Sequence, residues 1–435
     1  MTDYKDADDI SPSMCIMPWN GLATDPSGGI RPCCWMQSIT PDKFFGSPKE
    51  YKNSDYLKEI KNTFLKGEYP DICERCKHDD GKGLESKRTR ENKAWTDLGG
   101  DWNSIDDQEF TMVDLRLSNL CNLGCVMCGP KNSSLIGKET EEALAKDLPT
   151  QEHFHNQYKG TVNLNLINPY SDDDIDEIID IIPKDARIYC TGGEPSLVKK
   201  TTRLLEVLLE KGYNDSVILQ FNSNFQALNQ KWYDLLSQFK GDMLPSLDGV
   251  GRTAEYVRYP CDWERVDHNI REFVKQCGST WTIKIMPTTS ILSVFGFKDM
   301  WDWWYNDCRV NLPYINEAIE SGACRPHGPN GVLWPWAMRV QCNNRLVSPS
   351  YYDIRNLPTT AKQKVIEDID YILETYEPFR QVQGEVKYLK DVKKQVMLEP
   401  NTPFSKTIEN LDKLDKIRGN SWRESLPELA VFEHD

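Results

Sequence analysis

Three closely spaced cysteines are the residues of this 435-residue sequence whose type and spacing most directly suggest chemistry. Cys121, Cys125 and Cys128 are separated by three and then by two residues, just beyond an expected strand. Three thiolates on one loop can bind three irons of a cubane iron–sulfur cluster, in which four cysteines are the usual ligand set. The remaining iron is then open to an outside molecule, whereas structural zinc is closed by four ligands. On spacing alone, zinc with a remote fourth ligand and simple buried thiols stay open as alternatives.

The composition of the whole chain favours metal binding by its cysteines. There are 14 of them, and the sequence does not start with a basic region followed by an apolar one, so we expect no secretion signal. In a reducing compartment, closely spaced cysteines hold metal more often than they form disulfides. The net charge of −15 argues against binding to nucleic-acid backbone, and no apolar run reaches the roughly 18 residues of a membrane span. We therefore expect a cytoplasmic protein that binds neither nucleic acid nor membrane.

The central part of the sequence alternates strands with helices, which is typical of β/α units around a parallel sheet. We expect strands at residues 111–119, 186–191, 216–224, 242–248, 281–288 and 333–346. We expect helices between them at residues 197–211, 231–239, 264–276 and 298–305, with 147–169 as an inserted segment. Three regions follow: a cysteine-rich part at 1–105 with a helix at 54–66, the β/α part at 106–350, and a charged helical part at 351–435 that closes with a helix at 410–418.

The expected strands alternate apolar with polar residues, as in 113–118, 219–224 and 281–285. Side chains alternate faces along a strand, so helices on the apolar face would leave the polar face pointing into a barrel. Closed barrels fill their interior with branched apolar side chains. A polar interior instead predicts an open, partial (β/α)6 barrel in which the lumen is a binding site. An antiparallel sheet with one wet face is the alternative.

A second motif, Thr191-Gly192-Gly193-Glu194-Pro195, lies downstream of the cysteine triplet. The triplet's spacing, its place after a strand and this motif together resemble the radical S-adenosylmethionine (SAM) superfamily, over roughly residues 106–290. The resemblance implies that the open iron of a [4Fe-4S] cluster binds the amino and carboxylate groups of SAM. It also implies reductive cleavage of SAM to methionine and a 5′-deoxyadenosyl radical, which abstracts hydrogen from a substrate.

The resemblance assigns SAM-binding roles residue by residue. It implies that Gly192, Gly193 and Glu194 contact the amino group of SAM and that Ser223 and Asn224 lie near its ribose. It also implies that Ser246 and Arg258 hold hydroxyl and carboxylate groups of SAM, and the planar guanidinium of an arginine is well suited to bind a carboxylate. Many family members have an aromatic residue just before the third cysteine, where this chain has Met127, so we do not assign stacking on adenine to this position. The alternatives are a simple helix-start turn at 192–195 and a surface salt bridge for Arg258.

The N-terminal cysteines resemble a twitch module, a shortened relative of the SPASM domain that holds one auxiliary cluster. The pattern is Cys, then glycine, four residues, Cys, a gap and Cys-x-x-Cys, which assigns Cys15, Cys33, Cys73 and Cys76 as ligands. Cys34 can replace Cys33, because Gly29 gives it the same offset. Such modules usually follow the barrel, and here the module precedes it. A closed four-cysteine zinc site fits the same residues.

These features predict a radical SAM enzyme that oxidises a small molecule or a peptide, with an auxiliary [4Fe-4S] cluster accepting the electron and a donor such as flavodoxin or ferredoxin. A redox-neutral peptide epimerase or cross-linking enzyme is the second reading, and a non-catalytic zinc or iron–sulfur protein the third. Arg116, Asn222 and Lys284 are the candidate substrate residues, with Asp114 as the alternative partner of Lys284. We expect the isolated cysteines to be buried thiols: Cys190, Cys261, Cys277, Cys308, Cys324 and Cys342.

Overall fold

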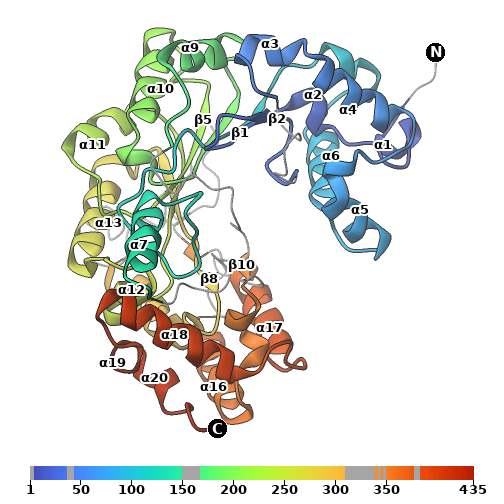
Figure 1. Ribbon diagram of the computed structural model, residues 1–435. Helices are drawn as coiled ribbons and strands as arrows, with labels where there is room; N and C mark the ends of the chain where they lie inside the picture. Colours follow the sequence, from blue (N-terminus) through green and yellow to red (C-terminus); the bar gives the residue numbers. More distant parts are fainter. Residues whose placement is uncertain are drawn as a thin grey trace. The chain divides into compact units, whose positions relative to one another are not determined.

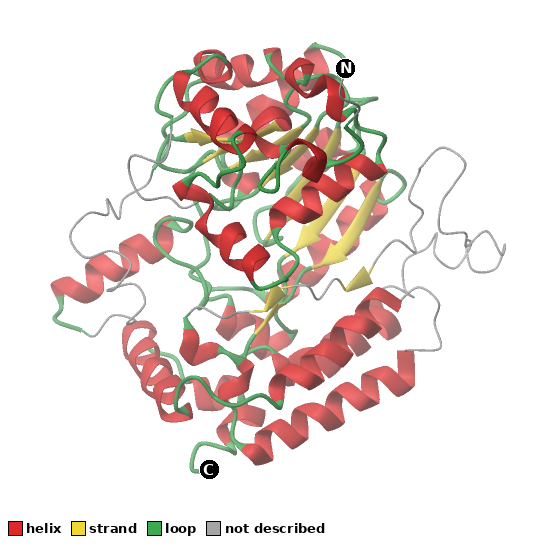
Figure 2. Cartoon of the chain, turned by 90° about the vertical axis from the view of Figure 1, so that its right-hand side faces the viewer, coloured by secondary structure: helices red, strands yellow, loops and turns green. Residues whose placement is uncertain are grey.

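A computed structural model describes most of the chain as helices joined to short strands (Figure 2). The described residues are 4–36, 44–148, 167–308, 339–340, 344–345, 349–376 and 383–435. They divide into two compact units, the first made of residues 1–118 and 167–220 and the second of residues 119–166 and 221–435. Within the described residues, no helix is both long and apolar enough to span a bilayer.

The first unit contains a mainly parallel sheet. Strand β1 (Gly21–Thr24) pairs in antiparallel fashion with β2 (Ile30–Arg31) and in parallel with β3 (Met112–Leu115), which pairs in parallel with β4 (Arg187–Cys190). Helices α9 (Asp172–Asp180) and α10 (Lys199–Glu210) pack side by side (Figure 1). The apolar side chains of α10 repeat at helical spacing and are buried, so this amphipathic stripe fixes the helix on its neighbours.

Short helices form the N-terminal part of the first unit. They are α1 (Ala7–Ile10), α2 (Met17–Asn20), α3 (Pro48–Lys52), α4 (Asp55–Leu65), α5 (Glu74–Gly81) and α6 (Lys87–Asp97). Their shared core includes Met14, Ile16, Trp19, Phe64 and Trp102 together with Cys15 and Cys33. Two of the candidate cluster ligands are therefore part of the apolar core of this module.

The second unit combines the remaining strands with most of the long helices. Strand β6 (Gly241–Pro245) pairs in parallel with β7 (Trp281–Ile285), and β7 pairs in parallel with β9 (Arg339–Val340). A small second sheet joins β8 (Thr288–Thr289) to β10 (Asn344–Arg345). The helices are α7 (Ser134–Ala145), α11 (Gln230–Leu236), α12 (Gly251–Val257), α13 (Trp263–Cys277), α14 (Phe297–Asp302), α16 (Thr359–Tyr376), α17 (Gln383–Val396), α18 (Phe404–Arg418), α19 (Trp422–Ser425) and α20 (Pro427–Ala430).

The structure confirms a mixed α/β fold with parallel pairing, and the antiparallel alternative is wrong. The first five expected strands correspond to β3, β4, β5 (Ile218–Ser223), β6 and β7, each a few residues shorter than expected. The expected strand at 333–346 and the inserted segment at 147–169 lie largely outside the described residues. Closure into a six-stranded partial barrel, the N-terminal twitch module and the three-region division stay predictions.

Candidate functional site

The loop that carries Cys121, Cys125 and Cys128 is held at its middle by backbone hydrogen bonds. The amide of Val126 donates to the carbonyl of Val257 at 2.8 Å, and the amide of Gly124 donates to the carbonyl of Tyr259 at 2.5 Å. Val257 is the last residue of α12, and Tyr259 follows two residues later. At the other side, Ser133 caps the first turn of α7 and its hydroxyl donates to the Leu123 carbonyl at 2.7 Å. These contacts fix the course of the loop between two helices of the second unit.

Two predicted SAM-binding residues of the second unit contact thiols of this loop. Arg258 Nη1 donates to Cys125 Sγ at 3.7 Å, and Asn224 Nδ2 lies 3.9 Å from Cys121 Sγ. Burial raises the pKa of the Cys125 thiol, and the charge of Arg258 opposes this shift. Burial, aided by the charge of Cys125, raises the pKa of the Cys128 thiol to about 12. Burial thus favours the protonated form of Cys125 and Cys128, and the neighbouring guanidinium of Arg258 would stabilise the Cys125 thiolate when metal replaces the proton.

Arg258 is fixed by a buried carboxylate rather than lying on the surface. Its Nη2 is 2.7 Å from Asp248 Oδ2, and the two side chains are 10% and 0% exposed. Asp248 is itself held by the Thr288 amide at 2.6 Å. The surface salt-bridge alternative for Arg258 is therefore wrong. Within the described chain, Arg258 Nε is buried without a hydrogen-bond partner, which leaves a donor of the kind that suits a carboxylate such as that of SAM.

The other SAM-assigned residues of the second unit gather at the ends of β5 and β6. The Ser246 amide donates to the Ser223 carbonyl at 2.9 Å, so the two serines are neighbours. The hydroxyl of Ser223 accepts from the Phe225 amide, where the chain turns with a positive φ of 59°. Asn224 Nδ2 also donates to Asn122 Oδ1 at 2.9 Å, which links this turn to the cysteine loop. Met127 is half-buried on that loop.

The Gly192-Gly193-Glu194 motif belongs to the first unit and forms a tight turn after β4. Both glycines have a positive φ, of 78° and 60°, and a Cβ on Gly192 would lie 2.9 Å from Cβ of Arg116. Glycine is thus required by backbone geometry at this turn. Glu194 is buried and accepts hydrogen bonds from the amide and hydroxyl of Ser196, as a helix cap does. The helix-start reading describes this turn correctly, and a contact of Glu194 with SAM stays a prediction.

In the first unit, all four cysteines assigned to an auxiliary site line one hollow of about 410 Å³, a volume that includes its opening to solvent. The lining residues are Cys15, Cys33, Cys73 and Cys76, with Met17, Trp35, Met36, Phe64, Tyr69, Lys87 and Arg88. No three His, Cys, Asp or Glu side chains in the described residues converge as one metal ion requires, so the thiols border a space rather than meet at a point. A set of four thiols with two cations beside it has the donor chemistry of an iron–sulfur site, whose bound cluster is anionic.

Helix α6 positions Cys15 in this hollow. Asn92 accepts from the Ile16 amide at 2.9 Å and donates to the Met14 carbonyl at 2.7 Å, and so grips the backbone on both sides of the cysteine. Arg88 also donates to the Met14 carbonyl at 2.9 Å. Burial raises the pKa of Cys15 to about 12. Cys73 is the N-cap residue of α5 and Cys76 lies in the first turn of that helix, so the start of α5 supplies both thiols to the hollow.

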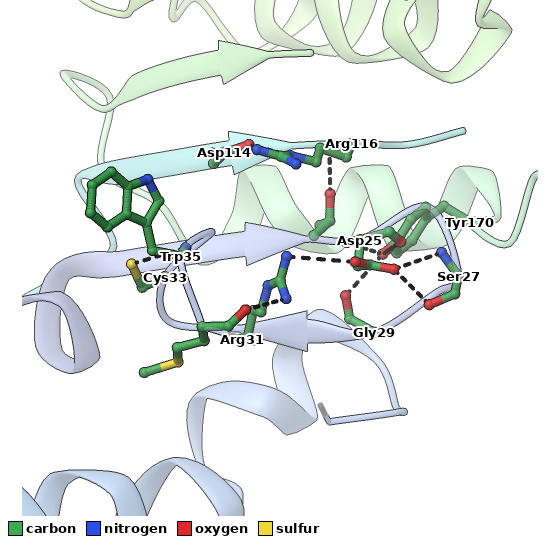
Figure 3. A network of polar contacts seen from close by, with 11 residues as sticks. Asp25, Ser27, Gly29, Arg31, Cys33, Trp35, Asp114, Arg116 and Tyr170 are labelled. Carbon is green, nitrogen blue, oxygen red and sulfur yellow. Dashed lines mark hydrogen bonds and ion pairs between the residues drawn. The ribbon is translucent and has the colours of Figure 1, made fainter. Parts of the chain in front are cut away.

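A buried polar network positions Cys33 (Figure 3). Arg31 forms an ion pair with Asp25 at 3.5 Å, with side chains 4% and 1% exposed, and donates to the Met36 carbonyl at 2.7 Å. The Tyr170 hydroxyl accepts from the Asp25 amide at 3.1 Å and donates to its carbonyl at 2.8 Å. The bond from Arg31 to the Met36 carbonyl therefore connects the turn at residues 33–36 to the β1–β2 hairpin and fixes the position of that turn.

Cys34 differs from Cys33 in its surroundings. Among the described residues, Cys34 is not part of the hollow's lining, and its thiol lies 3.3 Å from Lys87 Nζ. A hydrogen bond from Cys33 lowers the pKa of Cys34 to about 7, and the same bond with burial raises that of Cys33. This geometry favours Cys33 over Cys34 as the residue that faces the hollow. The lysine that accompanies Cys34 was not found from the sequence, since 53 positions separate the two.

The isolated cysteines divide into two kinds. Cys190, Cys277 and Cys308 are buried, as expected for packing thiols. Cys261 is only half-buried and accepts from Gln226 Nε2 at 3.6 Å. Burial raises the pKa of its thiol to about 12, with Arg258 opposing and the charge of Cys125 adding to the shift, so Cys261 lies near the cysteine loop. Cys324 and Cys342 lie outside the described residues.

Two of the candidate substrate residues, Lys284 and Arg116, form ion pairs, and the partner of Lys284 is not the one expected from the sequence. Lys284 pairs with Asp242 at 2.7 Å, whereas Asp114 pairs with Arg116 at 3.3 Å. The suggested pairing of Lys284 with Asp114 is therefore wrong, because the register of β6 and β7 places Asp242 directly opposite Thr282, on the face that Lys284 shares.

Two further side chains on β5 and β7 present polar atoms without partners. In the described part of the chain, Asn222 Oδ1 and Thr282 Oγ1 are buried and make no hydrogen bond. Buried polar atoms are rarely left unpaired, so each such atom needs an explanation. Thr282 was not singled out from the sequence, although it lies two residues before Lys284 on the same polar face.

The chain matches no protein-family model and no curated protein. Among solved structures, it is similar to native anSMEcpe with bound AdoMet, at 15% identity and a TM-score of 0.33, over 60% of this chain and 60% of that one. It is also similar to Streptococcus suis SuiB, at 12% identity and a TM-score of 0.30, over 61% of this chain and 60% of that one. These matches span about three-fifths of each neighbour.

The iron content of the protein tests the two sets of cysteines. If both sites hold four-iron clusters, anaerobic reconstitution should give about eight irons per chain. The Cys73→Ser, Cys76→Ser variant should retain about four, because the cysteine loop of the second unit is unchanged. Iron and zinc are measured by elemental analysis. About four irons and one zinc in the unmodified chain would instead support structural zinc at the N-terminal site.

Proposed function

We propose that the chain is a radical SAM enzyme that abstracts hydrogen from a small molecule or a peptide and oxidises it. The observation that carries the proposal is the loop of Cys121, Cys125 and Cys128, whose thiols are contacted by Asn224 and Arg258. The sequence motifs assign these same two residues to SAM. A loop that needed only to pack its thiols would require neither a buried arginine nor an amide beside them.

Each residue has a role that follows from its position. The three thiolates would hold a [4Fe-4S] cluster, which with SAM supplies a one-electron cleavage that generates the hydrogen-abstracting radical. The buried Asp248 keeps the guanidinium of Arg258 in place and charged, so that it faces Cys125 and offers Nε to a carboxylate. Ser223, Asn224 and Ser246, at neighbouring strand ends, offer hydroxyl and amide groups to the sugar of SAM.

The N-terminal hollow supports oxidation over a redox-neutral reaction. Its four thiols would give a cluster a complete set of protein ligands, which suits electron transfer rather than substrate binding. Lys87 and Arg88 line the same hollow and would offset part of the negative charge of such a cluster. A closed auxiliary cluster of this kind would accept the electron that the substrate radical releases.

Formation of 5′-deoxyadenosine tests this function. The reconstituted chain, incubated anaerobically with SAM and dithionite, should produce 5′-deoxyadenosine and methionine in equal amounts, measured by liquid chromatography. The chain without iron should produce neither. A fully reconstituted chain that binds about four irons in the cysteine loop and yet never cleaves SAM would overturn the proposal and favour a non-catalytic metal protein.

A further inference from the structure

An arginine from the C-terminal helix contacts the middle of the cysteine loop. Arg418, the last residue of α18, donates from Nη2 to the Gly124 carbonyl at 2.5 Å. Gly124 lies immediately before Cys125. The Arg418 side chain is only 1% exposed, and its charge is close enough to Cys125 to oppose the raised pKa of that thiol.

The guanidinium of Arg418 is held on three sides. Its Nε and Nη2 bind the two carboxylate oxygens of Glu139, on α7, at 2.8 Å and 2.9 Å. The guanidinium carbon lies 4.8 Å from the centre of the Tyr259 ring, in a cation–π contact. Tyr259 is also the residue whose carbonyl accepts from the Gly124 amide. Arg418 thus joins α7 and the segment directly after α12 to the loop itself.

Gly124 leaves the space that Arg418 occupies. A Cβ at this position would lie 2.9 Å from Arg418 Nη2 and 3.5 Å from the Tyr259 carbonyl oxygen. The absence of a side chain at Gly124 therefore lets the loop backbone lie close to the arginine. A larger residue at this position would have to displace the guanidinium of Arg418.

The end of α18 is fixed independently of the loop. Asp415, one turn before Arg418, accepts from the Tyr256 hydroxyl and from the Trp422 amide, both at 2.8 Å. Gly419 ends the helix with a φ of 67°. Because Tyr256 lies on α12, the helix that also supplies the backbone partner of Val126, the C-terminal helix and the loop share one support.

We infer that Arg418 is a positioning residue: α18 acts as a clamp that holds the Cys121–Cys128 loop in the conformation needed to bind its cluster. The inference depends on the proposed function only in that the loop receives a cluster. Arg418 and Arg258 together place two guanidinium groups near Cys125. Their positive charge would favour the more negative, reduced state of the cluster.

Thiol labelling in the metal-free protein tests the clamp directly. In Arg418→Met, Glu139 is left without its partner and the loop loses its central anchor, so N-ethylmaleimide should label Cys121, Cys125 and Cys128 about tenfold faster than in the unmodified chain. Cys15 and Cys33, in the first unit, should react at unchanged rates and serve as an internal control. Labelling of each cysteine is followed by peptide mass spectrometry.

Arg423→Met is the matched control. Arg423 lies five residues further on, pairs with Asp412 at 2.8 Å and with Glu433, and does not contact the loop in the described chain. It should leave the labelling rates of the loop cysteines unchanged. Equal labelling rates of the loop cysteines in Arg418→Met and Arg423→Met would overturn the inference. They would show that Arg418 affects the loop no more than an arginine of the C-terminal region that does not contact it.

Arg418→Lys keeps the charge but loses the fork that binds Glu139 and Gly124 together. If Arg418→Met does not fold, Arg418→Lys should fold and show intermediate labelling, whereas labelling as in the unmodified chain would count against the inference. In the reconstituted protein, Arg418→Met should shift the reduction potential of the loop cluster to a more negative value, measured by redox titration with paramagnetic resonance. An unmodified chain that holds its cluster but does not cleave SAM would remove the proposed function and leave the labelling result standing.

Discussion

Replacing Cys121, Cys125 and Cys128 together by Ala should abolish 5′-deoxyadenosine formation and leave the N-terminal cluster intact. Three thiolates are the fewest that hold a four-iron cluster with one open iron, so no residual SAM cleavage is expected. The four cysteines of the first unit lie in a separate hollow with its own supports, the Asn92 grip on Cys15 and the Arg31 network behind Cys33. About four irons should therefore remain in the triple variant.

The measurement combines iron analysis with chromatography of the SAM products. Cys277→Ala, Cys308→Ala is a suitable control, since both thiols are buried outside the loop and lie in the second unit. This double variant should lose some stability through the cavities it creates but should still cleave SAM. Continued 5′-deoxyadenosine formation in the triple variant would contradict the assignment of the loop as the SAM-cleaving centre.

Local sequence patterns predicted the strands well because each pattern is set within a few residues. Alternation of apolar and polar side chains located β3, β5 and β7, and the parallel pairing of β3 with β4 and of β6 with β7 agrees with the helices that separate these strands along the chain. The strand β1 was missed. It has four buried residues without alternation and is recruited to β3 from a segment about 90 residues away. Nothing local in a short apolar segment shows that it will pair so far along the chain.

Long-range partners were the other limit of sequence reasoning. The spacing of Cys121, Cys125 and Cys128 is local and could be recognised. Other partners are distant in the sequence. Asp248 lies 10 positions from Arg258, and Asn92 lies 77 positions from Cys15, whose flanking backbone it binds. Arg418 lies 294 positions from Gly124. Such contacts are fixed by packing of helices and by strand register, and neither is visible in a single sequence. The error over Lys284 has the same cause, because its true partner follows from the register of β6 and β7.

Lys284→Met should remove substrate turnover while SAM cleavage continues. Lys284 and Asp242 form a pair with side chains 15% and 21% exposed, on the same face as Thr282, whose hydroxyl is buried without a partner in the described residues. A lysine at this place can donate a charged hydrogen bond to a substrate group. Loss of a charged hydrogen bond to substrate predicts at least a tenfold fall in turnover, or about 1.5–3 kcal/mol. Met has a similar length and keeps the packing of the stem.

The pair with Asp242 complicates this single variant, because methionine leaves a partly buried carboxylate without its partner, at a cost of about 1–3 kcal/mol in folding stability. Adding Asp242→Asn removes that charge, so the Lys284→Met, Asp242→Asn double variant should unfold at a temperature close to that of the unmodified chain. If Lys284 serves the substrate, the double variant still lacks turnover, although it continues to cleave SAM and its thermal unfolding temperature returns close to that of the unmodified chain. If Lys284 only neutralises Asp242, the double variant regains turnover together with stability, and that recovery would remove Lys284 from the substrate site. Thermal unfolding by circular dichroism and turnover of substrate against 5′-deoxyadenosine formation, measured on the same preparations, separate the two outcomes.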